Sequence, residues 1–336
     1  MNAALKPYAA NATYAGKRVL ITGGLGFIGS TLANRLVEQN AEVTILDAMI
    51  PAFGGNWRNI DNIREQVTIY QDDMRHYHAL VPIVRDKDFI FHLAGQVSHG
   101  DSMREPLHDL GVNCISTMHL VEACRQHNPT ARIVYTSTRQ VYGAPQSLPV
   151  TEDHPVLPVD VNGINKLAAE YYHLLYDRVY DLRSTVVRLT NTYGPRLQIQ
   201  NDRQGFIGVF LKRCLTNQEI LIYGDGKQVR DFNYVDDVVD ALLLANLNDN
   251  CFGHVFNLGG PDRYSLLEFV DTLNQIVPVN SRIVPFPDNK KLIDIGDYYG
   301  DYSRFSELTG WKPCVGLHEG LSRTIAFYQE NFSHYL

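Results

Sequence analysis

One segment constrains the fold more than any other: RVLITGGLGFIGS, residues 18–30, where a short apolar run leads directly into a glycine-rich turn and then a helical pattern. Glycines three residues apart allow a sharp turn, close packing of the helix on a sheet, and close approach of backbone N–H groups to a diphosphate. The start of the helix adds partial positive charge. The pattern therefore predicts a dinucleotide site. The predicted cofactor-binding residues in this turn are Gly23, Gly26, Phe27, Ile28 and Gly29.

An acidic residue stands at the end of the second apolar run. Asp47 follows Glu42–Leu46 at the spacing expected for a ribose-binding acid. A carboxylate there accepts hydrogen bonds from both hydroxyls of an adenosine ribose, and it repels a 2′-phosphate. The sequence therefore favours NAD over NADP.

Apolar runs alternate with helix-length amphipathic stretches through the first half of the chain. The runs are nearly continuous in Val, Ile, Leu and Phe, as in parallel strands that are covered on both faces. We therefore predict a Rossmann-type, doubly wound α/β fold. The predicted strands are 18–22, 42–47, 67–70, 88–93, 132–137 and 184–190, and the predicted helices are 27–39, 75–84, 116–127 and 164–180.

The regular alternation of strand and helix patterns ends at about residue 190, after which turn-rich segments separate shorter helices. We predict a flexible N-terminal lead-in at 1–16, a NAD-binding domain at 17–190, and a smaller mixed α/β substrate domain at 191–336 that partly interleaves with the first. A ligand cleft is expected between the two domains.

Composition narrows the function classes. Thirty Lys and Arg stand against 37 Asp and Glu, a net charge of −7, which argues against nucleic acid or a membrane surface as partner. No apolar run approaches the ~20 residues of a membrane span. The five cysteines are scattered without a CxxC pair, which is typical of buried, reduced thiols in a cytoplasmic protein and gives no metal site.

Several further motifs follow in a fixed order: DDMR (72–75), HLAGQ (92–96), YTSTRQVYG (135–143), NTYGP (191–195), RDFNYVDD (230–237) and DYS…GW (301–311). With TGGLGFIG they make residues 17–330 resemble the extended short-chain dehydrogenase/reductase family, in its NAD-dependent nucleotide-sugar epimerase and dehydratase branch. The resemblance implies that Asp73 and Met74 hold the adenine. It also implies that Leu93, Ala94, Gly95 and Leu189 lie along the cofactor.

The same resemblance implies a substrate end. Asn191 matches the position that contacts the sugar or its diphosphate, and Arg230 matches a diphosphate-binding arginine. Lys291 replaces a second arginine, and Arg196 is a further cation on that side. Segments 205–211 and 221–223 match those that clamp the nucleotide base. The helices at 112–127 and 164–180 match the surface through which relatives form homodimers.

The implied catalytic set has one departure. Thr138 and Lys166 match the family's Ser/Thr and Lys, but Asn162 stands four residues before Lys166, where the resemblance predicts the catalytic Tyr. Asn165 likewise stands where Ser is usual. An amide takes up no proton near neutral pH, so Asn162 cannot be the general base.

Three interpretations of this departure stay open. His99 or Asp101, in the segment after HLAGQ, takes the proton instead, and His99 is the better suited because histidine titrates near neutral pH. Alternatively, Asn162 orients a water that relays the proton. In the third interpretation, the protein binds NAD and a nucleotide sugar without turnover.

Two residues next to Thr138 bear on the reaction. Relatives that are 4,6-dehydratases carry an Asp-Glu pair where this chain has Arg139 and Gln140, so dehydration is disfavoured. Arg139 is either the partner of a carboxylated sugar or, as we expect more, a surface arginine paired with a neighbour.

We predict an NAD-dependent nucleotide-sugar epimerase that oxidises the sugar transiently, and that is a homodimer. The alternatives are a nucleotide-sugar dehydrogenase, decarboxylase or dehydratase, or a non-catalytic NAD and nucleotide-sugar sensor.

Overall fold

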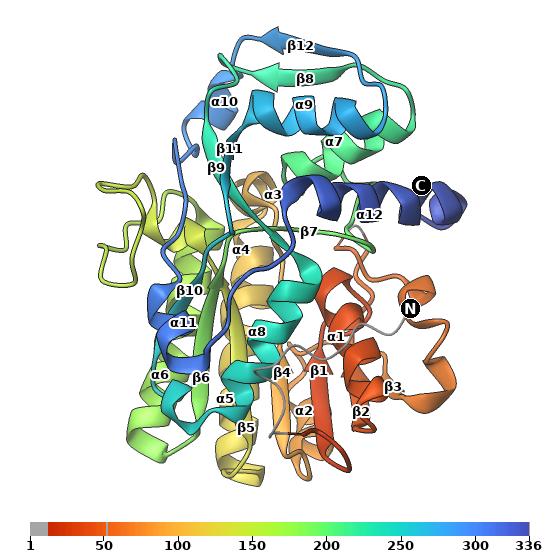
Figure 1. The fold of residues 1–336 in the computed structure, drawn as a ribbon. Coiled ribbons are helices and arrows are strands. Elements are labelled where there is room, and N and C mark those ends of the chain that lie inside the picture. The colour runs from red at the N-terminus through yellow and green to blue at the C-terminus, as the bar shows by residue number, and fades with distance from the viewer. Residues whose placement is uncertain (1–12, 52, 336) are drawn as a thin grey trace.

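A seven-stranded parallel sheet forms the larger part of the molecule in the computed structural model, which describes residues 13–51 and 53–335 (Figure 1). The strand order is β10–β6–β5–β4–β1–β2–β3. Chain order reverses between β1 and β4, and ligands bind at such a point in open α/β sheets. The doubly wound fold is confirmed. The strands are β1 (Arg18–Thr22), β2 (Glu42–Leu46), β3 (Thr68–Tyr70), β4 (Phe89–His92), β5 (Arg132–Thr138), β6 (Ser184–Leu189) and β10 (Val255–Leu258).

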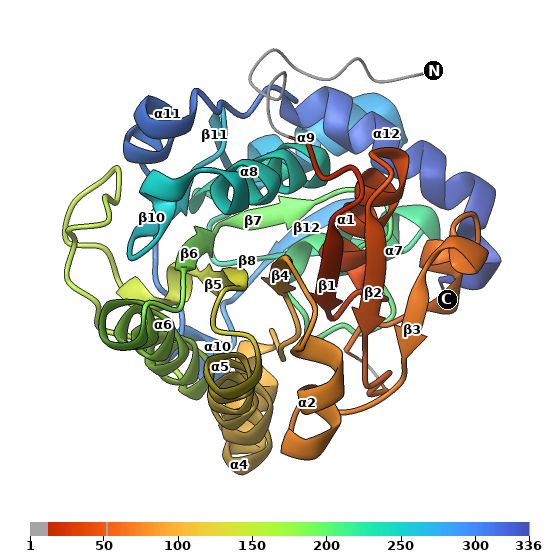
Figure 2. The same cartoon turned by 90° about the horizontal axis from the view of Figure 1, so that it is seen from below.

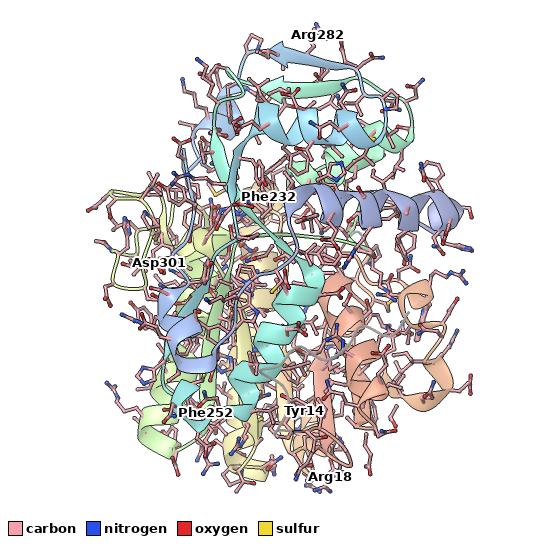
Figure 3. The ribbon with its side chains drawn as sticks, viewed as in Figure 1. Tyr14, Arg18, Phe232, Phe252, Arg282 and Asp301 are labelled. Atoms are coloured by element: carbon pink, nitrogen blue, oxygen red, sulfur yellow. The ribbon has the colours of Figure 1, made fainter. Side chains whose placement is uncertain are left out.

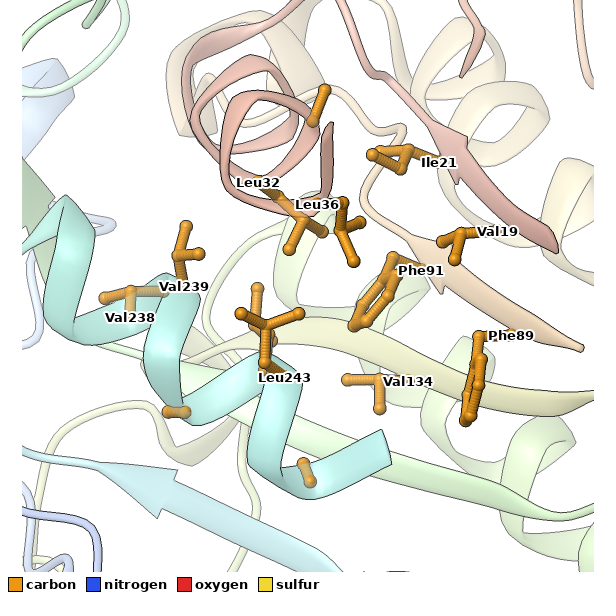
Figure 4. Close-up of a cluster of buried hydrophobic side chains, with 14 of the residues drawn as sticks. Val19, Ile21, Leu32, Leu36, Phe89, Phe91, Val134, Val238, Val239 and Leu243 are labelled. Carbon is orange, nitrogen blue, oxygen red and sulfur yellow. The ribbon is translucent and has the colours of Figure 1, made fainter. Parts of the chain in front are cut away.

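Helices cover both faces of this sheet, as its nearly continuous apolar strands require (Figure 2). On one face lie α1 (Phe27–Glu38) and α8 (Val235–Leu247), and on the other α2 (Tyr77–Val84), α5 (Ser116–His127) and α6 (Val161–Tyr180). Figure 4 shows the hydrophobic layer between the sheet and the helices α1 and α8, in which Leu36 of α1 and Leu243 of α8 meet Phe91 of β4. Burying one such side chain contributes about 1.5–3 kcal/mol, so this layer holds α1 and the turn before it firmly on the sheet.

A smaller lobe sits above the carboxyl ends of the strands (Figure 1). It is built on a three-stranded sheet, β11–β9–β7, and a two-stranded sheet, β12–β8. Phe232 of β9 lies in its core, between the two lobes in Figure 3. The elements of this lobe are β7 (Asn191–Tyr193), α7 (Phe206–Leu215), β8 (Ile220–Tyr223), β9 (Val229–Tyr234), β11 (Arg263–Ser265), α9 (Leu266–Ile276), β12 (Ser281–Val284), α10 (Asp288–Lys291) and α12 (Leu317–Asn331).

The chain crosses between the lobes more than once. Strand β10 joins the large sheet beside β6, and α11 (Ser303–Thr309) packs on β10, although both follow residue 190. Between β4 and α5 the chain forms three short helical turns. These are α3 (His99–Arg104), α4 (Pro106–Asp109) and a π-helical turn (Leu110–Ile115).

The structure corrects two expectations. Residues 1–12 of the expected flexible lead-in lie outside the described residues, but Tyr14 is fully buried, and its hydroxyl donates to the Leu243 carbonyl at 2.9 Å. The Tyr14 ring packs edge-on against Phe89 of β4. Tyr14 therefore closes this end of the core. All five cysteines are free thiols, yet Cys314 is exposed rather than buried. No helix in the described ranges combines the length and apolar character needed to cross a bilayer.

Candidate active site

A cavity of about 400 Å³ opens at the carboxyl ends of the strands, between the large sheet and the smaller lobe. Its walls come from the glycine-rich turn, the ends of β2, β4, β5 and β6, and the helices α6 and α7. The structure brings most of the predicted site residues together here. Those that line the cavity are Gly23, Gly26, Phe27, Ile28, Gly29, Asp47, Asp73, Met74, Leu93, Ala94, Gly95, His99, Thr138, Asn162, Lys166, Leu189 and Asn191.

The glycine-rich turn forms an open cradle. Gly23 has φ +71°, and a Cβ there would lie 2.9 Å from the backbone of Ala94. A Cβ on Gly29 would lie 2.2 Å from the Gly23 carbonyl oxygen. Gly26 is the N-cap residue of α1, and no side chain caps that helix. The start of α1 therefore offers N–H groups to an anion in the cavity, which fits a dinucleotide diphosphate.

Backbone amides fix the acid at the end of β2. The Asp47 carboxylate accepts hydrogen bonds from the N–H groups of Leu25, at 3.0 Å, and Met49, at 2.9 Å. Burial raises the pKa of Asp47, and these two hydrogen bonds oppose that shift. The carboxylate keeps further lone pairs for the hydroxyls of a ribose. Asp73, also in the wall, is held by a forked ion pair with Arg75.

Lys166 reaches the opposite end of the cavity from α6. Its Nζ donates to the Thr136 carbonyl at 2.8 Å and lies 4.6 Å from the centre of the Tyr135 ring. Burial lowers the pKa of Lys166 to about 8. Thr138 ends β5, and its Oγ1 accepts from the Gln140 N–H at 3.2 Å. The Thr138 hydroxyl hydrogen stays available to a ligand.

Asn162 belongs to a hydrogen-bonded set that sequence reasoning missed. Its Nδ2 donates to the Gln96 carbonyl at 2.8 Å and to Asp109 Oδ2 at 3.2 Å, while Asn165 Nδ2 donates to Asp109 Oδ1 at 2.7 Å. Asp109, at the end of α4, is buried. Both N–H bonds of the Asn162 side chain are thus taken. Asn162 can offer a ligand only its carbonyl oxygen, which accepts a hydrogen bond but no proton.

His99 is the candidate for the proton acceptor that Asn162 cannot be. It begins α3, and its Nδ1 lies 2.9 Å from Oδ2 of Asp160, although the two atoms are not in line for a hydrogen bond. Asp160 is the N-cap residue of α6 and also accepts from the Gly163 N–H at 2.6 Å and from Gln140 Nε2 at 3.0 Å. Burial opposes its charge, yet His99 and these donors hold the pKa of Asp160 below its usual value.

The alternative base, Asp101, is committed elsewhere. Its carboxylate pairs with Arg104 and, at 3.2 Å, with Arg203, and Asp101 does not line the cavity. Of the two residues proposed in this segment, the geometry favours His99. Asp160 had a sequence signal, since an Asp directly before a helix is a common N-cap. Asp109 had none, because the short turns α3 and α4 bring it beneath α6.

The predicted substrate cations lie outside the cavity wall. Arg230 is buried on β9, where its guanidinium donates to the carbonyls of Val229 and Gly296 and pairs with Asp294 at 3.5 Å. Lys291 is exposed on α10, and Arg196 lines a small neighbouring pocket. Gly296 and Asp294, in the loop after α10, take up the Arg230 guanidinium, and Arg230 does not line the cavity.

Arg139 is instead the arginine in the cavity wall, which corrects its expected place on the surface. It follows Thr138 directly, at the start of a 3₁₀ turn (Arg139–Tyr142), and its Nη1 donates to Asn191 Oδ1 at 2.9 Å. Because β5 ends at the cavity, the residue that follows it lies in the cavity wall rather than on the outer surface.

Comparisons with known proteins agree with this geometry. A model of the NAD dependent epimerase/dehydratase family matches residues 19–259. A putative UDP-glucose 4-epimerase of Methanocaldococcus jannaschii is 32% identical over 93% of this chain and 99% of its own. UDP-glucuronic acid decarboxylase 1 of Danio rerio is 31% identical over 95% of this chain and 74% of its own. The crystal structure of UDP-glucose 4-epimerase from Thermotoga maritima, with UDP-glucose, superimposes with a TM-score of 0.86, at 30% identity, over 94% and 99% of the two chains.

Proposed function

Because the chain belongs to the NAD dependent epimerase/dehydratase family and is an enzyme of that family, we propose that it is a nucleotide-sugar epimerase. Its cofactor is NAD, and the cradle and Asp47 fit that cofactor. One observation carries the specific proposal. Thr138, Lys166 and His99 line the same cavity as the glycine-rich turn, so a sugar beside the cofactor meets both a hydroxyl-binding group and a proton acceptor.

The reaction needs one proton acceptor and one positioning group. NAD, when bound, supplies the acceptor for the hydride that leaves a sugar carbon. Thr138 holds the hydroxyl on that carbon, and His99 takes the hydroxyl proton at Nε2, since its Nδ1 faces Asp160. Asp160 stabilises the imidazolium that forms. After the oxidised sugar has turned its other face toward the nicotinamide site, His99 would return the proton to the same oxygen, and the sugar would leave with no net redox change.

The other predicted site residues bind the cofactor or the sugar rather than transfer the proton. Lys166 positions the nicotinamide ribose through its ammonium group. The Asn162 carbonyl oxygen accepts a hydrogen bond from a cofactor or sugar hydroxyl. Leu189 packs against the nicotinamide, while Asp73 and Met74 hold the adenine.

Two rival functions are less well supported. Dehydration needs a carboxylate pair beside Thr138, and Arg139 and Gln140 supply none. A non-catalytic sensor needs a cavity without a base, whereas His99 and Asp160 lie 2.9 Å apart in this one.

The test is to incubate the protein with UDP-, dTDP-, GDP- and CDP-linked sugars and follow them by NMR. We expect a new stereoisomer of one of them, without accumulation of NADH. Stoichiometric NADH would indicate a dehydrogenase instead. Binding of a nucleotide sugar without any new product would favour the sensor.

We also propose a homodimer. An apolar stripe of Ile164, Tyr171 and Leu175 is exposed along α6, and Leu107 of α4 is exposed beside it. These side chains have the spacing of one helix face. A second copy of the chain is the occupant that this face suits, since the same stripe would meet itself across a two-fold axis.

A further inference from the structure

Arg139, in the cavity wall, makes few contacts with other polar groups of the protein. Its Nη1 donates to Asn191, and its guanidinium carbon lies 5.5 Å from the centre of the Tyr298 ring. Its Nε is buried and has no hydrogen-bond partner. A buried N–H without an acceptor costs about 1–3 kcal/mol, so the Arg139 guanidinium is not fully satisfied by the protein.

The carboxylates near Arg139 are already occupied. Asp231 Oδ1 accepts from the Thr190 hydroxyl, and its Oδ2 accepts from the N–H groups of Gly260, at 3.1 Å, and Gly300, at 3.0 Å. Asp294 pairs with Arg230. Among the residues that the structure describes, Arg139 forms no ion pair with a carboxylate. Burial lowers the pKa of Arg139 in spite of these acids, which fits a cation that lacks a direct counter-ion.

Charge is distributed unevenly along the cavity. Within the described residues, the acidic side chains in the wall are Asp47, Asp72 and Asp73, all at the adenosine end. The opposite end carries the cations Arg139 and Lys166 and, in the described part of the chain, no carboxylate in the wall. That end therefore favours an anion.

We propose that the sugar of the substrate carries a carboxylate, and that Arg139 binds it. This inference rests on the proposed function and adds the substrate class, a nucleotide-linked uronic acid. Arg139 follows Thr138 in the chain, so a sugar whose hydroxyl reaches Thr138 places a ring carboxylate near the guanidinium. The planar guanidinium holds its N–H groups in the fixed geometry that matches a carboxylate.

The contact between Arg139 and the carboxylate also affects whether the oxidised sugar loses CO₂. Loss of CO₂ from an oxidised uronic acid moves negative charge from the carboxylate into the sugar ring. Arg139 stabilises that charge on the carboxylate, so it disfavours the loss. The product expected with this arginine in place is an epimer that keeps its carboxylate.

The test is calorimetric binding of UDP-glucuronic acid and UDP-glucose to the NAD-loaded protein, in the wild type and in Arg139→Gln. We expect the wild type to bind the uronic acid at least about tenfold more tightly than glucose, and the variant to lose that preference. Glutamine keeps a donor for Asn191. Arg139→Lys, which keeps charge without the fork, should recover part of the preference. Arg304→Gln, at an exposed ion pair with Asp153, is the matched control.

Three results would overturn the inference. Equal binding of the two sugars by the wild type removes the carboxylate from recognition. Equal weakening of both sugars in Arg139→Gln assigns Arg139 to the diphosphate that they share. If neither sugar binds while NAD does, the proposed function itself is contradicted. Unchanged NAD affinity in each variant shows that the fold is intact.

Discussion

The departure at Asn162 belongs to a set of three side chains rather than to one position. Asn162 and Asn165 donate to the two oxygens of Asp109, so the buried carboxylate is satisfied by the residues at the two positions where the resemblance predicts Tyr and Ser. An exchange at one of these positions therefore affects the other two. The amide at position 162 and the hydrogen bonds to Asp109 are therefore parts of one local arrangement.

Asn165→Ala should destabilise the protein, because it removes a donor from Asp109 without admitting water. We expect the free energy of unfolding to fall by about 1–3 kcal/mol in a denaturant titration. Asn280→Ala, at an exposed asparagine, should change it by less than about 0.5 kcal/mol. Equal stability of the two variants would contradict the role given to Asp109.

NAD affinity should depend on pH through Lys166. Burial lowers the pKa of this lysine to about 8, so the ammonium donor is present below that pH and is lost as the pH rises through it. Affinity measured by calorimetry should therefore weaken above about pH 8. Lys166→Met should bind NAD more weakly at neutral pH and show little of this dependence. The same pH profile in both proteins would rule out Lys166 as the group responsible.

The sequence indicated the cofactor residues better than the proton-transfer residues. Gly23, Gly29 and Asp47 belong to a local strand–turn–helix unit, their spacing alone predicts their role, and the structure brings them to the cavity wall. The contacts of His99 with Asp160, and of Asn162 with Asp109, join segments that are far apart in the chain. No local pattern encodes such contacts, so only the folded structure reveals them.

The glycine-rich turn and α1 depend on each other. Gly29 lies in the first turn of α1, and a Cβ there would meet the backbone of Gly23 and Gly24 at 2.2 and 2.8 Å. The nearest atoms are all backbone, so no flexible side chain can move away to admit the methyl group. A larger residue at position 29 would therefore displace both α1 and the glycine-rich turn.

Gly29→Ala should lower both stability and NAD affinity, because the strand and the helix must separate to admit the methyl group. We expect a loss of at least about 1–3 kcal/mol in the free energy of unfolding and at least a tenfold weaker NAD affinity. Gly100→Ala is the matched control, since a Cβ there has nothing within 4 Å. Normal NAD binding by Gly29→Ala would contradict the close packing described here.

Element boundaries show where local sequence rules reach their limit. Six of the seven strands of the large sheet begin and end within a residue or two of the predicted runs, whereas β10 was not predicted. Helix α6 begins at Val161 rather than at the predicted Ile164, because the Asp160 cap outweighs the poor helix propensity of Gly163 in the first turn. That earlier start places Asn162 inside the helix and Asp160 within reach of His99.

At the scale of the whole molecule, the exposed stripe on α6 predicts association. Light scattering should give the mass of a dimer for the wild type and of a monomer for Tyr171→Glu, because a charge in the centre of an apolar interface is not solvated. Ile283→Glu, at an exposed apolar residue on β12 in the smaller lobe, should stay dimeric. A monomeric wild type would contradict the homodimer.

In the proposed reaction, His99, held by Asp160, accepts the proton that a tyrosine accepts in the family that the chain resembles. The direct measurement is the transient near-ultraviolet absorbance of NADH when the NAD-loaded enzyme meets the nucleotide sugar it converts, in the wild type, His99→Gln and Asp101→Asn. We predict that His99→Gln slows this transient by about 10²–10⁴-fold with sugar affinity little changed, while Asp101→Asn keeps the wild-type rate. A wild-type rate in His99→Gln would contradict the account.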